Sequence, residues 1–268
     1  MENSTVKYGK LPTVRVTAPS GAQAVVSLYG GHLLSWKTAD GQERLFFSEK
    51  SALDGSRAIR GGVPVIFPQF AARGTGMRHG FARVSNWHLT ETGTHADAAF
   101  ARFVLTDEWL EPEVAAAWPH KFKLVLDVVV RADDIRLSLT VHNTGEAPFE
   151  FSGALHTYFL VDELGKVRID GVQEGEFAIT DKYDHIYFGV EGPLALRSGH
   201  GTLKLEQEGF PDAVIWNPGA ADAAALVDMG DEEYDRFVCI EPATIAPRTL
   251  APEESWRGWH IITAVPAE

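Results

Sequence analysis

Apolar and polar residues alternate in short segments along much of the chain. In Ile135–His142, isoleucine, two leucines and valine occupy every second position, with arginine, serine, threonine and histidine between them. A period of two places successive side chains on opposite faces of a β-strand. The segment is therefore predicted to be a half-buried strand, and Asn143-Thr-Gly145 supplies the turn residues that close it.

The same reasoning predicts strands throughout the sequence, separated by turn residues. The predicted strands are Thr13–Thr17, Ala24–Tyr29, His32–Lys37, Arg44–Phe47, Trp87–Thr92, Ala98–Thr106, Lys121–Arg131, Phe149–Phe159, Lys166–Ile169, Thr202–Glu206, Ala213–Trp216, Phe237–Glu241 and Trp256–Ala264. Helical candidates are few and short, Glu113–Trp118 and Ala220–Val227. This pattern is typical of an all-β sandwich or barrel and not of a parallel α/β fold. Without a repeat or a linker-like change in composition, we expect one domain over residues 1–268.

Composition narrows the possible partners. Hydrophobic residues make up 45% and charged residues 23% of the chain, which is typical of a globular protein. The net charge of −13 argues against a general surface for nucleic acid or for an anionic membrane. A small anion is not excluded, because a local group of arginines can reverse the sign of the potential around it.

The cysteine count and the N-terminal residues indicate the cellular compartment. A single cysteine, Cys239, excludes an internal disulfide framework and a zinc site built from several cysteines, and it fits a reducing compartment. The first seven residues lack the basic start and apolar run of a signal peptide, and no run approaches the ~20 apolar residues of a membrane span. We therefore expect a soluble cytoplasmic protein.

The segment from Arg60 to Arg83 is the most unusual in the chain. It surrounds a short apolar run, Val63–Phe67, with four arginines, a histidine and several glycines. Prolines interrupt the run, so it is predicted to be a short strand between two loops. Guanidinium groups suit phosphate or carboxylate because they donate in a planar fork. On local chemistry alone, an anion-binding loop and a solvated surface loop are both open.

His156 lies in a predicted strand that is rich in apolar and aromatic residues. Alternation places Ala154, His156 and Tyr158 on one face of this strand, and Leu155 and Phe159 on the other. The first face is polar enough to line a cleft, where a histidine can exchange a proton near neutral pH. A hydrogen-bonded core histidine is the alternative.

Glu241 follows four apolar residues and precedes a proline. On this predicted strand Phe237, Cys239 and Glu241 share one face, and Val238 and Ile240 the other. Burial of such a carboxyl group raises its pKa towards the range of a useful general base. The alternative is a glutamate in a salt bridge at the end of a strand.

Two further polar groups are candidates for ligand contact. His79 and Arg83 bracket Gly-Phe-Ala, and Arg78 precedes them, which suits either a ligand-facing loop or an exposed turn. Asp181 and Asp184 lie in a segment that turn formation alone could explain. Trp216, before Asn-Pro-Gly, is interpreted as a core residue in preference to a platform for a sugar.

Other signatures are missing from the sequence. It contains no P-loop, no dinucleotide fingerprint, no Gly-x-Ser-x-Gly elbow and no His-Glu-x-x-His. No set of histidines and carboxylates has the spacing of metal ligands. We expect neither a metal nor an organic cofactor.

Five motifs together resemble the hexose-6-phosphate mutarotases, a branch of the aldose 1-epimerase superfamily. They occur in the family's order and extend over nearly the whole chain: Arg60-Gly-Gly-Val-Pro-Val-Ile-Phe-Pro-Gln-Phe, His79-Gly-Phe-Ala-Arg83, Leu155-His-Thr-Tyr-Phe159, Val214-Ile-Trp-Asn-Pro218 and Phe237-Val-Cys-Ile-Glu-Pro242. The resemblance implies a large antiparallel β-sandwich of the galactose-mutarotase type. It also implies interconversion of the α and β anomers of a hexose 6-phosphate without a cofactor.

The resemblance also implies roles for individual residues. His156 and Glu241 match the family's catalytic histidine and glutamate, and Arg60 and Arg83 match arginines that contact a phosphorylated substrate. Asp184 matches a hydroxyl-binding aspartate, with Asp181 as its rival. The sequence departs from the family where His185 replaces arginine and where Arg78 replaces glutamine.

These roles predict a mechanism and its alternatives. Glu241 as base and His156 as acid would open the sugar ring and close it on the other face, so His156 must be protonated while Glu241 is ionised. The expected partner is a small sugar phosphate, with no nucleic acid or membrane, and the protein is expected to be a monomer. An epimerase of unphosphorylated aldoses and a non-catalytic sugar-phosphate module are the alternatives.

Overall fold

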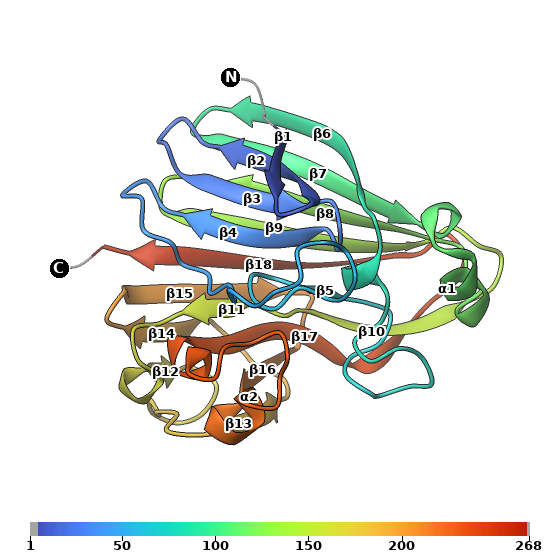
Figure 1. Cartoon of the computed structure of the whole chain (residues 1–268). Helices are drawn as coiled ribbons and strands as arrows, with labels where there is room; N and C mark the ends of the chain where they lie inside the picture. Colours follow the sequence, from blue (N-terminus) through green and yellow to red (C-terminus); the bar gives the residue numbers. More distant parts are fainter. Residues whose placement is uncertain (1–4, 267–268) are drawn as a thin grey trace.

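The computed structural model describes residues 5–266 and consists mainly of antiparallel strands (Figure 1). Eight strands form the largest sheet, in the order β12-β14-β15-β18-β9-β8-β7-β6. Their bounds are β6 His88–His95, β7 Ala98–Thr106, β8 Phe122–Val130, β9 Asp134–Asn143, β12 Arg168–Asp170, β14 Leu194–Ser198, β15 Gly201–Glu208 and β18 Ser255–Val265. Neighbouring strands in the chain pair in β6–β7, β7–β8 and β8–β9. Short turns join β6 to β7 and β8 to β9, whereas η2 and α1 lie in the connection between β7 and β8.

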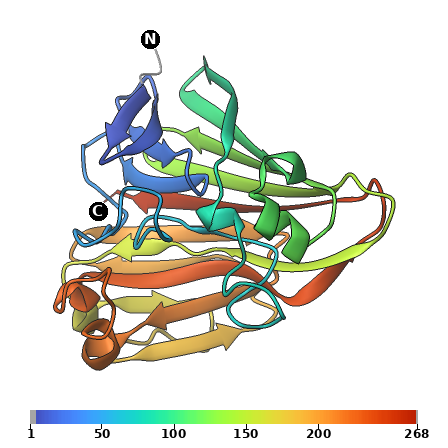
Figure 2. The ribbon, with the colours of Figure 1, turned by 45° about the vertical axis from the view of Figure 1, so that its right-hand side comes forward.

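A six-stranded sheet faces this one and carries the candidate site. Its order is β13-β16-β17-β10-β5, and β11 pairs with β17 beside β10. The bounds are β5 Val65–Ile66, β10 Phe149–Leu155, β11 Tyr158–Leu160, β13 Tyr183–Tyr187, β16 Asp212–Asn217 and β17 Phe237–Leu250. The views of Figures 1 and 2 both show β10, β16 and β17 in front of the part of the large sheet that contains β14 and β15.

A four-stranded sheet and short helices complete the described structure. The sheet has the order β1-β2-β3-β4, with β1 Thr5–Tyr8, β2 Leu11–Thr17, β3 Gln23–Ser27 and β4 His32–Lys37. The α-helices are α1 Pro112–Ala117 and α2 Gly219–Ala223, and the 3₁₀ helices are η1 Ala82–Val84, η2 Asp107–Trp109, η3 Leu164–Lys166 and η4 Glu233–Arg236. Over residues 5–266, no helix is long and apolar enough to cross a membrane.

One apolar core joins the three sheets. Trp36 from the small sheet, Leu126 from the large sheet and Ile240 from the six-stranded sheet are all buried in the same cluster. Strand β8 shows how the sequence produces this arrangement, because its buried residues alternate with more exposed ones from Phe122 to Val130. The inward residues lose water on folding, which stabilises the layered arrangement.

The all-β prediction is confirmed, and most predicted strands are present with ends shifted by one or two residues. The prediction for Arg44–Phe47 is wrong, since only isolated bridges occur there, such as Leu45 with Phe159. The second predicted helix is shorter than expected. Strand β13 was not predicted; its segment was interpreted as a possible turn, but it pairs over five residues with β16.

Candidate functional site

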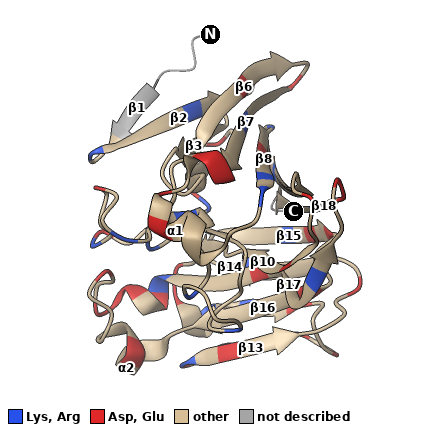
Figure 3. Ribbon diagram, turned by 90° about the vertical axis from the view of Figure 1, so that its right-hand side faces the viewer, with Lys and Arg blue, Asp and Glu red and all other residues tan. Residues whose placement is uncertain are grey.

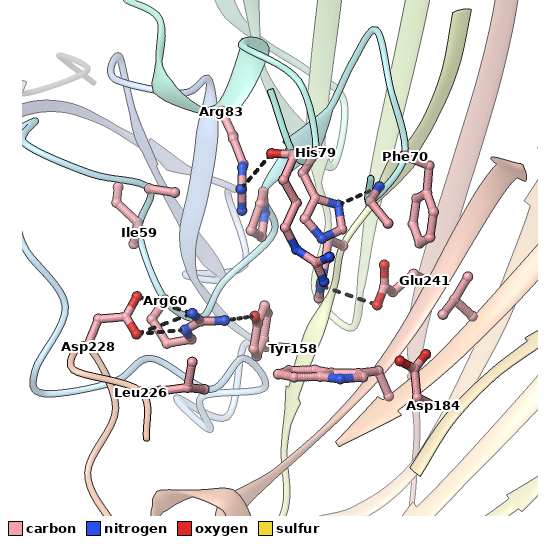
Figure 4. Close-up of a pocket in the computed structure, with 17 residues that line it drawn as sticks. Ile59, Arg60, Phe70, His79, Arg83, Tyr158, Asp184, Leu226, Asp228 and Glu241 are labelled. Carbon is pink, nitrogen blue, oxygen red and sulfur yellow. Dashed lines mark hydrogen bonds and ion pairs between the residues drawn. The ribbon is translucent and has the colours of Figure 1, made fainter. Parts of the chain in front are cut away.

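A cavity of about 300 Å³ lies at the six-stranded sheet, beneath the loop that connects β5 to η1. His156, Tyr158, Trp216 and Glu241 line it from the sheet, and the loop contributes basic side chains. Figure 4 shows Arg60, Arg83, Tyr158 and Glu241 directed toward this space. Acidic residues occur on α1, α2 and β13 (Figure 3), so the arginines at the cavity oppose the overall negative charge of −13.

The acid and the base predicted from sequence meet in this cavity. His156 Nδ1 lies 3.4 Å from Glu241 Oε1, and the side chains are 10% and 1% exposed. Neither His156 Nδ1 nor Glu241 Oε2 has a hydrogen-bond partner among the described residues. The pair is therefore buried, in contact and free to bond to a ligand.

The backbone explains how His156 reaches this position. The predicted strand Phe149–Phe159 is interrupted at His156 and Thr157, between β10 and β11. The His156 N–H still donates to Pro64 O at 3.0 Å, in register with the pairing of β10 and β5, and this bond anchors the backbone of His156. The face assignment is nevertheless correct: His156 and Tyr158 line the cavity, while Leu155 and Phe159 lie in the core. Glu241 is mid-strand, since β17 continues through Pro242 to Leu250.

Burial shifts the pKa values of Glu241 and His156 in opposite directions. Loss of water raises the pKa of Glu241 well above its ordinary value, and the charge of Asp184 raises it further. Loss of water also lowers the pKa of His156, and the nearby His79, Arg83 and Arg60 lower it further. Both shifts favour a neutral pair, with a protonated Glu241 beside an unprotonated imidazole, over the charged pair expected from the mechanism. Both arrangements hold one proton in total.

Aromatic rings fix the plane of the His156 imidazole. The Tyr158 ring stacks on it with 5.0 Å between centroids and an interplanar angle of 10°. Trp216 and His79 contact it edge-on at 5.9 and 5.5 Å. The interpretation of Trp216 as a core residue alone is wrong, because it lines the cavity. Three rings thus restrict the rotation of His156.

Arg60 is tightly held on two sides. Its Nη2 donates to both carboxylate oxygens of Asp228 at 3.2 Å, and its Nε donates to the same group at 3.3 Å. Its Nη1 donates to the Tyr158 hydroxyl at 3.0 Å. These contacts raise the pKa of Arg60, so it stays charged. The guanidinium is therefore positioned before any ligand arrives, with part of its charge offset by Asp228.

Arg83 contrasts with Arg60. Its Nη2 donates to the backbone O of Arg78 at 3.0 Å, but its buried Nε has no partner and no carboxylate pairs with it in residues 5–266. Burial lowers the pKa of Arg83, as does the charge of Arg60. Arg83 is half-buried, and a cation that loses part of its water without gaining a counter-charge is less stable than a paired one. Arg78 is exposed at the rim of the same cavity.

His79 is buried between the arginines and His156. Its N–H donates to Ala71 O at 2.9 Å, and its Nδ1 accepts a hydrogen bond from Ala71 N at 3.3 Å. That acceptor role assigns the ring proton to Nε2. Burial, followed by the charges of Arg83 and Arg78, lowers the pKa of His79 to about 3. His79 is therefore a neutral donor at neutral pH.

The loop around His79 depends on two other residues. The Gln69 side chain donates to Ala71 O at 3.0 Å and accepts from Gly76 N at 3.0 Å, which fixes the loop's width. Gly80 has φ +68°, and a Cβ there would lie 2.0 Å from Phe67 O. Only glycine fits this close approach, and it directs His79 toward the cavity.

The structure separates the two candidate aspartates. Asp184 lies on β13, opposite Trp216 on β16, and lines the cavity, whereas Asp181 is not among the lining residues. His185, at the position that departs from the family pattern, contacts the Tyr187 ring edge-on, with 4.5 Å between ring centroids. Asp184 is thus the aspartate that a ligand in the cavity would meet.

Among the described residues, one set of side chains could hold a cation. His156, Cys239 and Glu241 have ligand atoms within 4.8 Å of one another, and all three are buried. Thiolate, imidazole and carboxylate are ligands that Zn²⁺ accepts. Burial raises the pKa of the Cys239 thiol well above its ordinary value, which disfavours the thiolate needed for such binding.

Sequence reasoning missed two residues of the site, Tyr158 and Asp228. Tyr158 had a usable signal, since alternation already placed it on the face of His156. Asp228 had none: it lies in an irregular segment after α2 and reaches Arg60 only through the tertiary fold.

An antiparallel β-sandwich with a buried histidine–glutamate pair at a small, arginine-rimmed cavity defines a class of sugar epimerases. The family model of aldose 1-epimerase matches residues 12–182 and 173–263, and the chain belongs to this family. It is therefore an isomerase of the epimerase type.

Individual relatives of this chain carry epimerase or mutarotase names. A protein from Cenchrus ciliaris named "Putative glucose-6-phosphate 1-epimerase" is 33% identical, over 94% of this chain and 88% of its own. One of the same name from Escherichia coli is 32% identical, over 88% and 84%. The solved structure of a "putative mutarotase" from Salmonella typhimurium has a TM-score of 0.89 at 26% identity, over 98% of this chain and 94% of its own.

A galactose 1-epimerase from Lactobacillus acidophilus shares the fold, with a TM-score of 0.73 at 14% identity over 100% of each chain. The predicted galactose-mutarotase-like fold is thus confirmed.

Proposed function

We propose that the protein interconverts the α and β anomers of a hexose 6-phosphate, with glucose 6-phosphate as the preferred substrate. The phosphate assignment rests mainly on Arg83, a half-buried guanidinium without a carboxylate partner in residues 5–266, which lines the same cavity as the His156–Glu241 pair. A phosphate dianion would supply the missing counter-charge. The names of the relatives from Cenchrus ciliaris and Escherichia coli support the same substrate.

We assign the chemistry to Glu241 and His156. Glu241 removes the proton of the anomeric hydroxyl, the C1–O5 bond breaks, and His156 gives its proton to the ring oxygen, which leaves the open-chain aldehyde. Rotation about C1–C2 presents the other face of the carbonyl. The reverse transfers then close the ring as the other anomer, and both residues return to their starting states. Such proton transfers typically contribute about 10²- to 10⁴-fold each.

The remaining candidates have supporting roles in this proposal. Arg60, Arg83 and Arg78 contact the phosphate, while Asp184 and His79 bond to sugar hydroxyls. Asp184 accepts hydrogen bonds from them, and His79 donates from Nε2. No step in this chemistry requires a metal or an organic cofactor.

The Arg60–Asp228 pair favours a second candidate, an epimerase of unphosphorylated aldoses, because it offsets one of the charges that a phosphate would use. The test is anomerisation of α-glucose 6-phosphate and of α-glucose, followed by proton NMR. We expect kcat/KM to be higher for the phosphate ester. A higher value for glucose would replace the first candidate with the second.

We also propose that the chain acts as a monomer of one domain in the cytoplasm, without a nucleic-acid or membrane partner. The single cysteine and the net charge of −13 support this proposal. Light scattering after size exclusion tests the monomer, and a dimer mass would overturn it.

A further inference from the structure

The anion site and the acid–base pair are physically connected. Arg60 donates to the Tyr158 hydroxyl at 3.0 Å, and the Tyr158 ring stacks on His156 at 5.0 Å. His156 in turn contacts Glu241 at 3.4 Å. The bond from Arg60 fixes the Tyr158 hydroxyl, and the Tyr158 ring fixes the plane of the imidazole, so one rigid side chain joins the anion site to the acid–base pair.

The two partners of the pair face different charges. Arg83, Arg60 and His79 face His156 from the loop, Tyr158 faces it from β11, and Glu241 and Cys239 face it from β17. Glu241 is influenced by the negative Asp184 on β13. A negative charge placed at the arginines therefore acts mainly on His156, because it cancels the field that opposes the imidazolium.

The reaction needs His156 as imidazolium beside an ionised Glu241, and the two groups lie 3.4 Å apart. Burial disfavours both charged forms in the empty site, because it lowers the pKa of His156 and raises that of Glu241. Transfer of a proton from Glu241 to His156 creates imidazolium and carboxylate together. The total charge of the pair is unchanged, and no proton is taken from or given to solvent.

We propose that an anion bound by Arg60 and Arg83 activates the acid–base pair, and that Tyr158 is the positioning residue that joins the anion site to His156. The inference rests on the proposed function and extends it, since the phosphate then contributes to the rate of the chemical step as well as to binding. The energy of its binding is used at the reacting centre, some distance from the phosphate itself.

The first experiment supplies the sugar and the anion as two separate molecules. The wild-type protein turns over α-glucose in the presence of phosphite dianion, which is small enough to occupy the anion site beside an unphosphorylated sugar. We expect phosphite to activate the enzyme saturably, with kcat/KM for glucose rising at least about 10-fold. Sodium sulfate at matched ionic strength serves as a second dianion and should also activate. Equal activation by chloride at the same ionic strength would show that the activation is a nonspecific effect of salt, and it would overturn the inference.

A second experiment detects the protonation state of His156 directly. With ¹⁵N-histidine labelling, the His156 signals are assigned by their loss in His156→Asn. We expect phosphite to move these signals from the neutral towards the imidazolium pattern, which a purely structural role of the anion would not do. Signals that remain neutral at saturating phosphite would contradict the proposal.

The role of Tyr158 is tested by Tyr158→Phe, which keeps the stacked ring and removes the hydroxyl. We expect the phosphite activation to fall at least about fivefold, and kcat for glucose 6-phosphate to fall with it. Tyr234→Phe is the matched control, because Tyr234 is half-buried on η4 and is not among the cavity residues. Thermal unfolding shows whether each variant is folded.

The outcomes distinguish the inference from the function beneath it. If glucose 6-phosphate is preferred over glucose but phosphite activates nothing, the inference is wrong and the proposed function stands. If glucose is preferred, the proposed function itself is wrong. If Tyr158→Phe raises KM while full activation and kcat persist, Tyr158 only assists binding and its positioning role is wrong.

Discussion

Arg60 and Asp228 form a two-pronged ion pair that holds one edge of the guanidinium while the other edge meets Tyr158. Residues 168 positions apart in the chain thus share one interaction. Arg83, in the same cavity, has no such partner in the part of the chain that the structure describes. This difference suggests distinct roles: Arg60 is a fixed contact, and Arg83 is the residue that gains most from a bound anion.

Removal of either member of the acid–base pair should abolish most of the activity. We expect Glu241→Gln and His156→Asn each to lower kcat for glucose 6-phosphate by about 10²- to 10⁴-fold, because each loses one proton transfer. Polarimetry measures the rate, and the unfolding midpoint confirms that the fold is retained. Full activity in a folded variant would refute the assigned mechanism.

Replacement of Arg83 should separate binding from stability. We expect Arg83→Met to raise KM for glucose 6-phosphate by at least about tenfold, since a charge-assisted contact is lost. The same variant should be at least as stable as the wild type when empty, because a half-buried, unpaired charge is removed. Arg78→Met is the control for an exposed arginine of the same loop, and its effect should be smaller. A destabilised Arg83→Met would show that the contacts of the Arg83 guanidinium stabilise the fold.

Acidification should destabilise the protein through its buried histidines. Burial lowers the pKa of His32 and His260 to about 4 and that of His79 to about 3. In the unfolded chain these groups take up a proton below about pH 6.5. Each therefore removes up to about 1.4 kcal/mol of stability per pH unit as the pH falls from 6.5 towards 4.

Glu241 acts in the opposite sense over part of this range. Its raised pKa means that the folded protein keeps a proton which the unfolded chain loses above about pH 4.3, so this group costs stability as the pH rises. His156, whose pKa burial also lowers, acts in the same sense as the three histidines above. With four histidines against one carboxyl group, we expect urea denaturation to give lower stability at pH 5.5 than at pH 7.5. His260→Gln, distant from the cavity, should reduce that difference, and an unchanged difference would show that His260 does not titrate as described.

Gly80 should be the least replaceable residue of the loop. We expect Gly80→Ala to cost several kcal/mol and to displace His79, because the new Cβ would overlap Phe67 O and φ is +68°. Gly21→Ala is a matched control: φ there is +92° but no atom lies within 4 Å of the new Cβ. It should cost only about 1–2 kcal/mol. Equal losses in the two variants would mean that backbone strain alone, and not the close approach, sets the cost.

Metal removal should leave the reaction unchanged. We expect exhaustive dialysis against EDTA to preserve kcat for glucose 6-phosphate, since both proton-transfer groups are side chains. Activity lost on dialysis and restored by a divalent cation would make the protein a metalloenzyme.

The sequence by itself determined the strands and the faces that their residues occupy. Alternation placed His156 with Tyr158 and Glu241 with Cys239, because the period of a strand is a local property of the backbone. It could not show that the predicted strand Phe149–Phe159 divides at His156 and Thr157, since its two parts pair with strands far away in the chain. Nor could it find β13, whose pairing with β16 overrides turn-forming residues.

Tertiary structure alone decided how the chemistry is arranged. The sequence contained the arginines, the histidine and the glutamate, but it could not show that Arg60 has a carboxylate partner and Arg83 has none. It also could not locate the proton of the His156–Glu241 pair. Loss of water and the charges nearby set that position, and both follow from which distant segments the fold brings together.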